Sequence, residues 1–197
     1  MKLQDRLPDR VRVGGRTYRL DADFRNVLRM MEILARDDLI PGARDWLALR
    51  CVVRRPPRNA GPALAAVRAL LFPERKAPAD GKRLTSFEQD ADLIRAAFRQ
   101  AYGIDLYRDR LHWLEFAALL SALPEGSRYS EVLGIRARPM PKPTKYNQEE
   151  REWLARAKAA CALETSERER EMAYTRSVRA IFTGILEWAG KDGDAHG

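Results

Sequence analysis

The sequence predicts a mainly α fold: a helical, bundle-like domain with a β-hairpin at its N-terminal end and a helical extension at its C-terminal end. Apolar residues recur at helical spacing through most of the chain, and only one short stretch alternates polar and apolar residues. Breaks containing Pro or Gly separate the helical segments. With 197 residues, 45% of them hydrophobic and 32% charged, the chain is long and apolar enough to fold around a core.

The alternating stretch lies near the N-terminus, on both sides of the pair Gly14–Gly15. Two alternating runs joined by such a pair are typical of a hairpin with a type I′ or II′ turn. Its apolar candidates are Val11, Val13, Tyr18 and Leu20. Because an isolated hairpin is only marginally stable in water, we expect its apolar side to pack on the helices.

Three helices are expected to follow the hairpin, of which the first is amphipathic. The first begins after Asp21 or Asp23, either of which can cap it, and ends near Asp37. Two more are predicted at about residues 43–54 and 63–72, after breaks that contain Pro and Gly.

A polar loop then leads to the most apolar part of the chain. Residues 73–85 read as a surface loop, and Thr85 or Ser86 can cap a helix that ends at Gly103. Residues 111–123 contain one formal charge, so we expect them to form a helix at the centre of the core. The expected structural core residues are Phe24, Phe98, Trp113 and Phe116.

A change in composition predicts where the helical domain ends. We expect the domain to cover residues 1–135, with Ser130 capping one short last turn. Residues 136–146 hold three Pro and four basic residues and are expected to be a linker. Residues 147–189 are charge-rich and are expected to form a helical hairpin, followed by a disordered tail over residues 190–197.

The charge pattern narrows the possible partners. The net charge is +8, but the basic excess is spread thinly, and no basic run is longer than the short one at residues 54–58. This favours a solvated surface over a nucleic-acid footprint. The first 16 residues carry charges where a signal peptide needs an apolar run, and no uncharged apolar stretch reaches 18 residues. We therefore expect a cytosolic protein that does not span a membrane.

Few side chains offer catalytic chemistry. Cys51 and Cys161 are too few for a disulfide framework or a zinc site, so we expect both to be free, buried thiols. His196 lies in the expected tail, and His112 stands alone beside Trp113, where a helix-start or core role is favoured over catalysis. We expect no catalytic residue, no cofactor and no metal site, which favours an interaction protein over an enzyme.

An ordered set of motifs resembles the bacteriophage gene-product-fifteen family of long-tailed phages and prophages. The resemblance covers about residues 3–140 and rests on these segments: Asp5–Pro8, Asp23–Arg25, Asp90–Asp92, Tyr102–Leu106, Leu111–Trp113, Phe116, Leu123–Pro124 and Tyr129–Arg136. It implies a gene between those for the major tail protein and the tape measure protein. Tail assembly chaperones hold that position in other long-tailed phages.

The resemblance therefore implies a non-enzymatic tail assembly chaperone in the cytoplasm of the bacterial host. Such a protein would coat the helical tape measure protein until tail-tube subunits displace it, and would self-associate or act with a second tail chaperone. Two alternatives remain open: a structural component of the virion tail, and a phage nucleic-acid-binding protein, whose affinity would fall steeply with salt.

The candidate partner-binding residues lie on an apolar stripe of the C-terminal helix. They are Tyr174, Ile181, Phe182, Ile185 and Trp188. Amphipathicity indicates that a helix face is covered but does not identify the covering element. The stripe could pack back on the helical domain, or it could bind another subunit or the tape measure protein.

Overall fold

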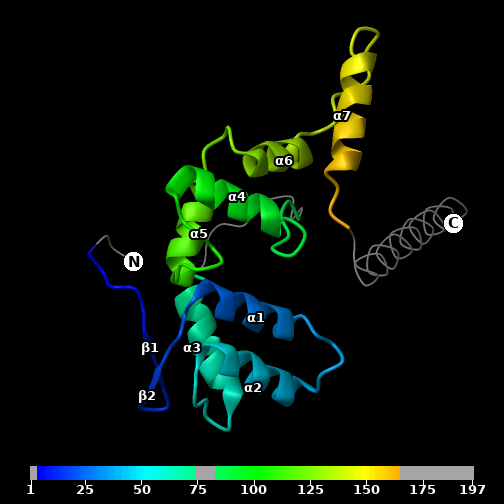
Figure 1. Cartoon of the computed structure of the whole chain (residues 1–197). Coiled ribbons are helices and arrows are strands. Elements are labelled where there is room, and N and C mark those ends of the chain that lie inside the picture. The colour runs from blue at the N-terminus through cyan, green and yellow to red at the C-terminus, as the bar shows by residue number, and fades with distance from the viewer. Residues whose placement is uncertain (1–3, 74–82, 165–197) are drawn as a thin grey trace, which may run out of the picture.

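The structure is a computed structural model that describes residues 4–73 and 83–164 (Figure 1). Within these ranges it contains seven helices and one two-stranded antiparallel sheet, so the predicted mainly α class with an N-terminal hairpin is confirmed. The second helix expected in the extension, with its apolar stripe, and the expected tail lie outside the described residues.

The hairpin forms where the alternating pattern placed it. Strands β1 (Arg10–Val13) and β2 (Arg16–Arg19) pair with Val11 opposite Tyr18. Gly14 and Gly15 have φ angles of 55° and 77°, and a type I′ turn needs this left-handed conformation at both positions. Val11 is buried, and β1 packs on α3 (Ala60–Leu71).

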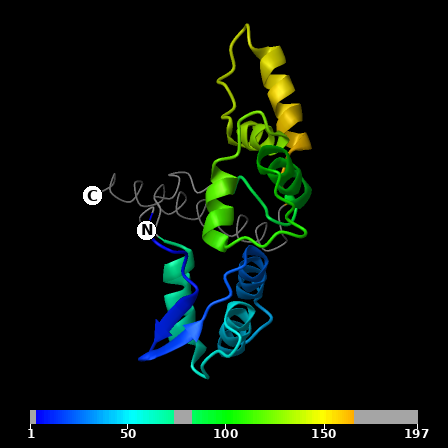
Figure 2. The same cartoon turned by 60° about the vertical axis from the view of Figure 1, so that its left-hand side comes forward.

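Three helices and the hairpin make up one end of the molecule (Figure 2). Helix α1 (Phe24–Leu34) packs on α2 (Pro41–Val52), and α2 packs on α3. Asp23 caps α1, since its carboxylate accepts a hydrogen bond of 3.1 Å from the backbone N–H of Arg25. The completely buried residues of this group are Val27, Met30, Ala48, Leu49, Val52 and Val67.

Helices α4 (Ala91–Tyr102) and α5 (Trp113–Ser121) add an aromatic cluster to the core. The ring of Phe116 lies at its centre, 4.6 Å from the ring centroid of Phe24, 5.2 Å from that of Phe98 and 5.8 Å from that of Trp113. All four expected core residues are at most 6% exposed. Gly103 ends α4 with a φ of 69°, as the sequence predicted.

Helix α5 is shorter and less enclosed than residues 111–123 suggested. Trp113 and Phe116 are its buried residues, whereas Leu114, Leu119 and Leu120 are half-buried. Helices α1 and α4 contact α5, and the rings of the aromatic cluster lie on one side of it. An almost continuous apolar sequence therefore did not mean burial on all sides.

The last helix expected in the helical domain is longer than the sequence suggested. Helix α6 (Arg128–Ala137) begins earlier and ends later than the short turn expected at Ser130. Its cap is Ser127, whose Oγ accepts a hydrogen bond of 3.2 Å from the backbone N–H of Ser130. Gly134 does not end the helix, because a glycine inside a helix costs only about 1 kcal/mol. Arg136 therefore lies in α6 and not in a linker.

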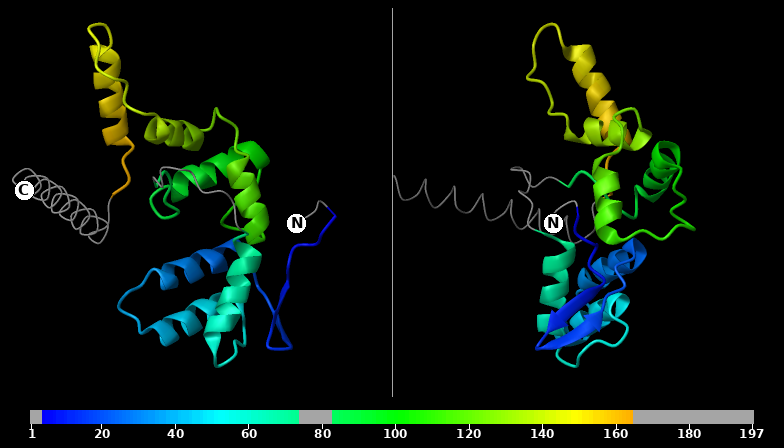
Figure 3. Two further views of the ribbon diagram at one scale, coloured as in Figure 1. Left: turned by 180° about the vertical axis from the view of Figure 1, so that it is seen from behind. Right: turned by 90° about the vertical axis from the view of Figure 1, so that its left-hand side faces the viewer.

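Helix α7 (Gln148–Ala160) is the first helix of the expected extension and projects at the far end of the molecule (Figure 3). It packs on α6, and its Leu154 is completely buried. The extension is thus joined to the helical domain by packing as well as by the chain.

Candidate functional site

The first turns of α1 and α5 are held side by side by backbone hydrogen bonds. Phe24 N–H donates to the carbonyl of Leu111 over 2.9 Å, and Trp113 N–H donates to the carbonyl of Ala22 over 2.7 Å. The indole N–H of Trp113 donates to the carbonyl of Leu71 over 3.0 Å. These bonds join α1, α3 and α5 at the aromatic cluster.

His112 has the helix-start role that the sequence predicted. Its Nδ1 accepts a hydrogen bond of 3.1 Å from Leu114 N–H and so caps α5. Its Nε2 lies 3.1 Å from the carbonyl oxygen of Pro8. Because that oxygen can only accept, Nε2 carries the proton and the imidazole joins the N-terminal segment to α5.

Arg25 fixes the loop between α4 and α5 against α1. One of its guanidinium nitrogens donates to the carbonyls of Leu106 (2.7 Å) and Asp109 (2.9 Å), and the other binds the carboxylate of Asp23. Arg110 also reaches Asp23, over 3.2 Å. This arrangement holds Leu106 and its neighbours at the edge of a groove between α1 and α4.

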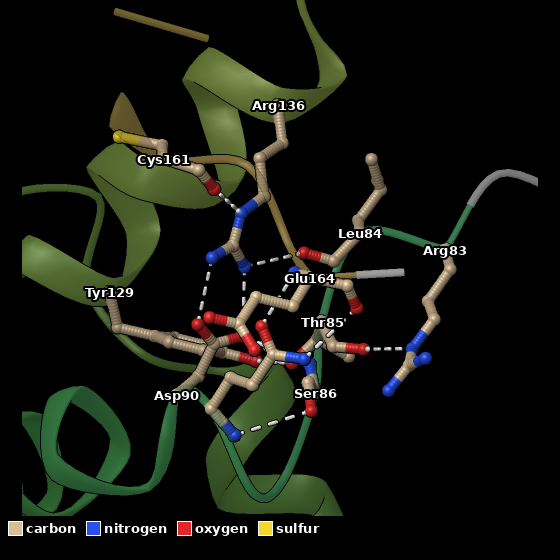
Figure 4. A network of polar contacts seen from close by, with 10 residues as sticks. Arg83, Leu84, Thr85, Ser86, Asp90, Tyr129, Arg136, Cys161 and Glu164 are labelled. Atoms are coloured by element: carbon tan, nitrogen blue, oxygen red, sulfur yellow. Dashed lines mark hydrogen bonds and ion pairs between the residues drawn. The ribbon is translucent and has the colours of Figure 1, made fainter. Parts of the chain in front are cut away.

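A buried ion pair joins the start of α4 to α6 (Figure 4). Arg136 donates two parallel hydrogen bonds to Asp90, of 2.8 and 2.9 Å, and the two side chains are only 10% and 2% exposed. The same guanidinium donates to the carbonyls of Leu84 (2.9 Å) and Cys161 (2.6 Å). One arginine of α6 thus binds two other segments of the chain, residues 84–90 and Cys161.

The surroundings of Asp90 keep its carboxylate charged. Burial alone would raise the pKa of Asp90, but hydrogen bonds from Arg136 and from the backbone N–H of Ser86, together with the charge of Arg136, lower that pKa below its ordinary value. The hydrogen bond to Asp90 raises the pKa of Arg136. Tyr129, whose hydroxyl lies 2.8 Å from that of Thr85, has a pKa raised by burial.

A first apolar groove, which we call the α1–α4 groove, has a volume of about 360 Å³. The buried rings of Phe24 and Phe116 contribute to its floor. Arg29, Glu32 and Arg95 bring charge to its lining. Its other lining residues are Arg25, Leu28, Phe87, Ala91, Ile94, Leu106 and Tyr107.

A second and larger groove, which we call the α1–α3 groove, has a volume of about 750 Å³. Its lining includes the completely buried Met30, the half-buried Met31 and the partly exposed ring of Phe72. Methionine side chains are flexible and polarisable, so a surface of this kind can adapt to apolar groups of different shape. Its other lining residues are Leu34, Ala35, Arg44, Asp45, Gly61, Leu64, Ala65 and Arg68.

The last described residues return to the start of α4. Glu164 N–H donates to the side-chain oxygen of Gln89 over 2.8 Å, and the side-chain amide of Gln89 donates to the carbonyl of Glu164 over 3.2 Å. Gln89 lies between Phe87 and Ala91, both of which line the α1–α4 groove. The last described residue is therefore held at the turn that precedes α4.

The candidate partner-binding residues, from Tyr174 to Trp188, lie outside the described residues. Cys51 and Cys161 are free thiols, but both are half-buried and not fully buried as expected. Burial raises the pKa of Cys51, which leaves less thiolate at neutral pH.

Sequence reasoning missed the side chains that hold the α4 and α6 segments together. Asp90, Tyr129 and Arg136 belong to the motifs that carry the family resemblance, yet nothing in their spacing showed that they meet. The sequence did offer one signal: Asp90 is the first residue of one motif, Arg136 is the last residue of another, and their charges are opposite. An acid and a base in separate motifs of one family are candidates for an ion pair.

Searches for two other kinds of site used only the residues that the structure describes. No group of three or more His, Cys, Asp or Glu residues is placed there to hold a metal ion. No helix in the same ranges is long and apolar enough to cross a membrane.

A family model described as Bacteriophage Gp15 protein matches residues 3–163. No curated protein and no solved structure matches the chain.

Proposed function

We propose, from the premise that this chain belongs to the bacteriophage Gp15 protein family, that it is a tail assembly chaperone. In this proposal it binds the tape measure protein during tail assembly and performs no catalysis. Family membership is the observation that carries the proposal, because the family resemblance implies a gene beside that of the tape measure protein.

The chemistry of the grooves supports a helical protein as the binding partner, which we call the client. A protein that keeps a long helix from aggregating must cover the apolar stripes of that helix, and apolar grooves between helices are a recurring way to do so. The α1–α3 groove offers the half-buried Met31 and the partly exposed Phe72 between charged side chains. An amphipathic helix matches such a groove, with its apolar face inward and its polar face in water.

Binding must also be reversible, because the tail-tube subunits have to displace the chaperone. Many weak sites along one client satisfy this need better than one tight site, since avidity holds the coat while each single contact exchanges quickly. Self-association, or pairing with a second chaperone protein, would supply that multivalency.

Co-expression tests the proposal. Expressed with the tape measure protein of the same phage, the chain should raise the soluble yield of that protein and co-purify with it. A parallel expression with an unrelated coiled-coil protein controls for a general effect on solubility.

Two results would contradict the chaperone role. If the tape measure protein stays insoluble and the chain is found in purified virions, the chain is a structural tail component. If it instead binds DNA or RNA with an affinity that falls steeply as salt is raised, it is a nucleic-acid-binding protein.

A further inference from the structure

We infer that the α1–α3 groove binds a helix that carries carboxylates beside its apolar face, and that Arg44 and Arg68 hold these carboxylates. Arg44 belongs to α2 and Arg68 to α3, and both line the groove. The inference rests on the proposed function, since it takes from there that the groove binds a helical client. It adds the chemical feature by which the groove selects that client.

The guanidinium of Arg44 carries a donor that its described surroundings leave unsatisfied. Its Nε atom is buried and has no hydrogen-bond partner in the part of the chain that the structure describes. The contact from this atom to the carboxylate of Asp45 is 3.9 Å long, which is beyond hydrogen-bond distance. A buried donor without an acceptor costs free energy, and the cost is greater when the donor is charged. The side chain is 29% exposed in the lining of the groove, so an acceptor on a bound partner can reach the guanidinium.

Arg68 brings a second positive charge to the same groove. It lies in the last turn of α3, it is exposed, and no ion pair joins it to another residue within the described ranges. Among the lining residues that the structure describes, Asp45 is the one acidic residue. The lining therefore has an excess of positive charge. A guanidinium can donate two parallel hydrogen bonds to one carboxylate, so carboxylates on the client are the matching groups.

The α1–α4 groove differs in this respect. Of the arginines that line it, Arg25 binds the carboxylate of Asp23, and Arg95 donates to Asp92 over 2.9 Å. Both guanidinium groups are thus already engaged by carboxylates of the same chain. In the α1–α3 groove, neither arginine donates a hydrogen bond to a carboxylate of the described residues. The α1–α3 groove is therefore better prepared to accept a carboxylate from outside.

The apolar part of the lining favours a helix over other carriers of negative charge. Met31, Leu34 and Phe72 line the groove and are only partly buried. Gly61 and Ala65 lie one turn apart on α3 in the same lining, and their small size lets a partner approach closely. An amphipathic helix covers such a surface with its apolar stripe and places aspartate or glutamate at the margin of that stripe. A phosphate backbone has no apolar stripe, so it would leave these side chains uncovered.

Two labelled model peptides test the inference with the full-length protein. Both are amphipathic helices of about 20 residues with a leucine stripe, and they differ only in carrying Glu or Gln beside that stripe. Fluorescence anisotropy measures the dissociation constant of each peptide for the unmodified protein and for the double variant Arg44→Gln/Arg68→Gln. The matched control is Arg50→Gln/Arg54→Gln, which removes the same charge at exposed positions outside both grooves.

The Glu peptide should bind the unmodified protein at least about tenfold more tightly than the Gln peptide, since its carboxylates gain charge-assisted hydrogen bonds. The two peptides should bind Arg44→Gln/Arg68→Gln equally, whereas the control double variant should keep the difference. Without peptide, the melting temperature of Arg44→Gln should not fall, because the described residues show no hydrogen bond of this side chain that the change would break.

Four results would overturn the inference. Two of them are equal binding of both peptides to the unmodified protein and binding of neither peptide. The third is loss of the difference in Arg50→Gln/Arg54→Gln, which would assign it to the overall charge of the protein. The last is a change from oligomer to monomer in Arg44→Gln/Arg68→Gln, measured by light scattering, which would assign the groove to a second copy of the chain. Failure of the chaperone role is a separate result, because co-expression with the tape measure protein decides it.

Discussion

Arg136 and Asp90 lie 46 positions apart and meet through two parallel hydrogen bonds of 2.8 and 2.9 Å. Arg136 comes from the last turn of α6, and Asp90 directly precedes α4. Because the same guanidinium also binds the carbonyl of Cys161, the pair joins the residues after α7 to the helical domain.

Removing one partner of this ion pair should destabilise the protein strongly. Asp90→Asn leaves the buried guanidinium without its counter-charge, which costs about 3–5 kcal/mol in the free energy of unfolding. Chemical denaturation measures this loss. Asp92→Asn is the matched control, because Asp92 also pairs with an arginine but its side chain is 95% exposed, and its loss should stay below about 1 kcal/mol. Equal losses for both variants would contradict a special role for Asp90.

The same pair should make the stability depend on pH in the acidic range. Since the pKa of Asp90 is lowered in the folded protein, the unfolded chain binds more protons near pH 4, and the free energy of unfolding rises with pH there. This contribution is fully present above the ordinary aspartate pKa of about 3.9 and is lost as the pH falls through the folded pKa. The stability gap between the unmodified protein and Asp90→Asn should therefore narrow below about pH 4. A constant gap from pH 7 to pH 3 would refute this.

The aromatic cluster should be sensitive to loss of its indole. Trp113→Ala removes a ring that is 6% exposed and leaves a cavity next to Phe116, which should cost about 3–5 kcal/mol. Trp153→Ala changes a tryptophan that is 51% exposed on α7, and its loss should be much smaller. If urea melts show less than about 1 kcal/mol for Trp113→Ala, Trp113 is not a core residue.

Two truncations should separate the described part of the extension from the rest. A chain that ends at Tyr146 loses the buried Leu154 and the carbonyl of Cys161 that Arg136 binds, so its melting temperature should fall clearly. A chain that ends at Glu164 keeps both groups. We expect the shorter chain to be less stable than the longer one by at least about 2 kcal/mol. Equal stability would mean that α7 is not part of the folded domain.

The α1–α3 groove should be the surface that binds a helical client if the proposed chaperone role holds. Ala65→Lys puts a long charged side chain at an exposed position that lines this groove. Ala69→Lys makes the same change one turn later on α3, at another exposed position that is not part of its lining. The first change should weaken co-purification of the tape measure protein at least tenfold, equivalent to about 1.4 kcal/mol, and the second should leave it unaltered. Equal binding by both variants would move the client site elsewhere.

Local features were predictable because short-range rules control them. The Gly14–Gly15 turn, the Asp23 cap and the end of α4 at Gly103 each depend on a few neighbouring residues. Phe24 and Phe98 were identifiable as core residues from helical periodicity, and Trp113 and Phe116 from an almost continuous apolar run. The residues after Glu164 remain a sequence-based expectation, and so does the partner-binding role of their stripe.

The sequence by itself determined the helical class, the hairpin, the start of α1, the end of α4 and the family, since propensity, periodicity and motif order are properties of the linear chain. Only the tertiary structure decided that Arg136 belongs to α6 and binds Asp90, that one side of α5 remains partly exposed, and that apolar side chains of α1, α3 and α4 line two grooves. The reason is physical. A charged or apolar side chain in the sequence shows what kind of neighbour would stabilise it, but not which one. Several distant segments can supply such a neighbour, and only the packing of the whole chain selects among them.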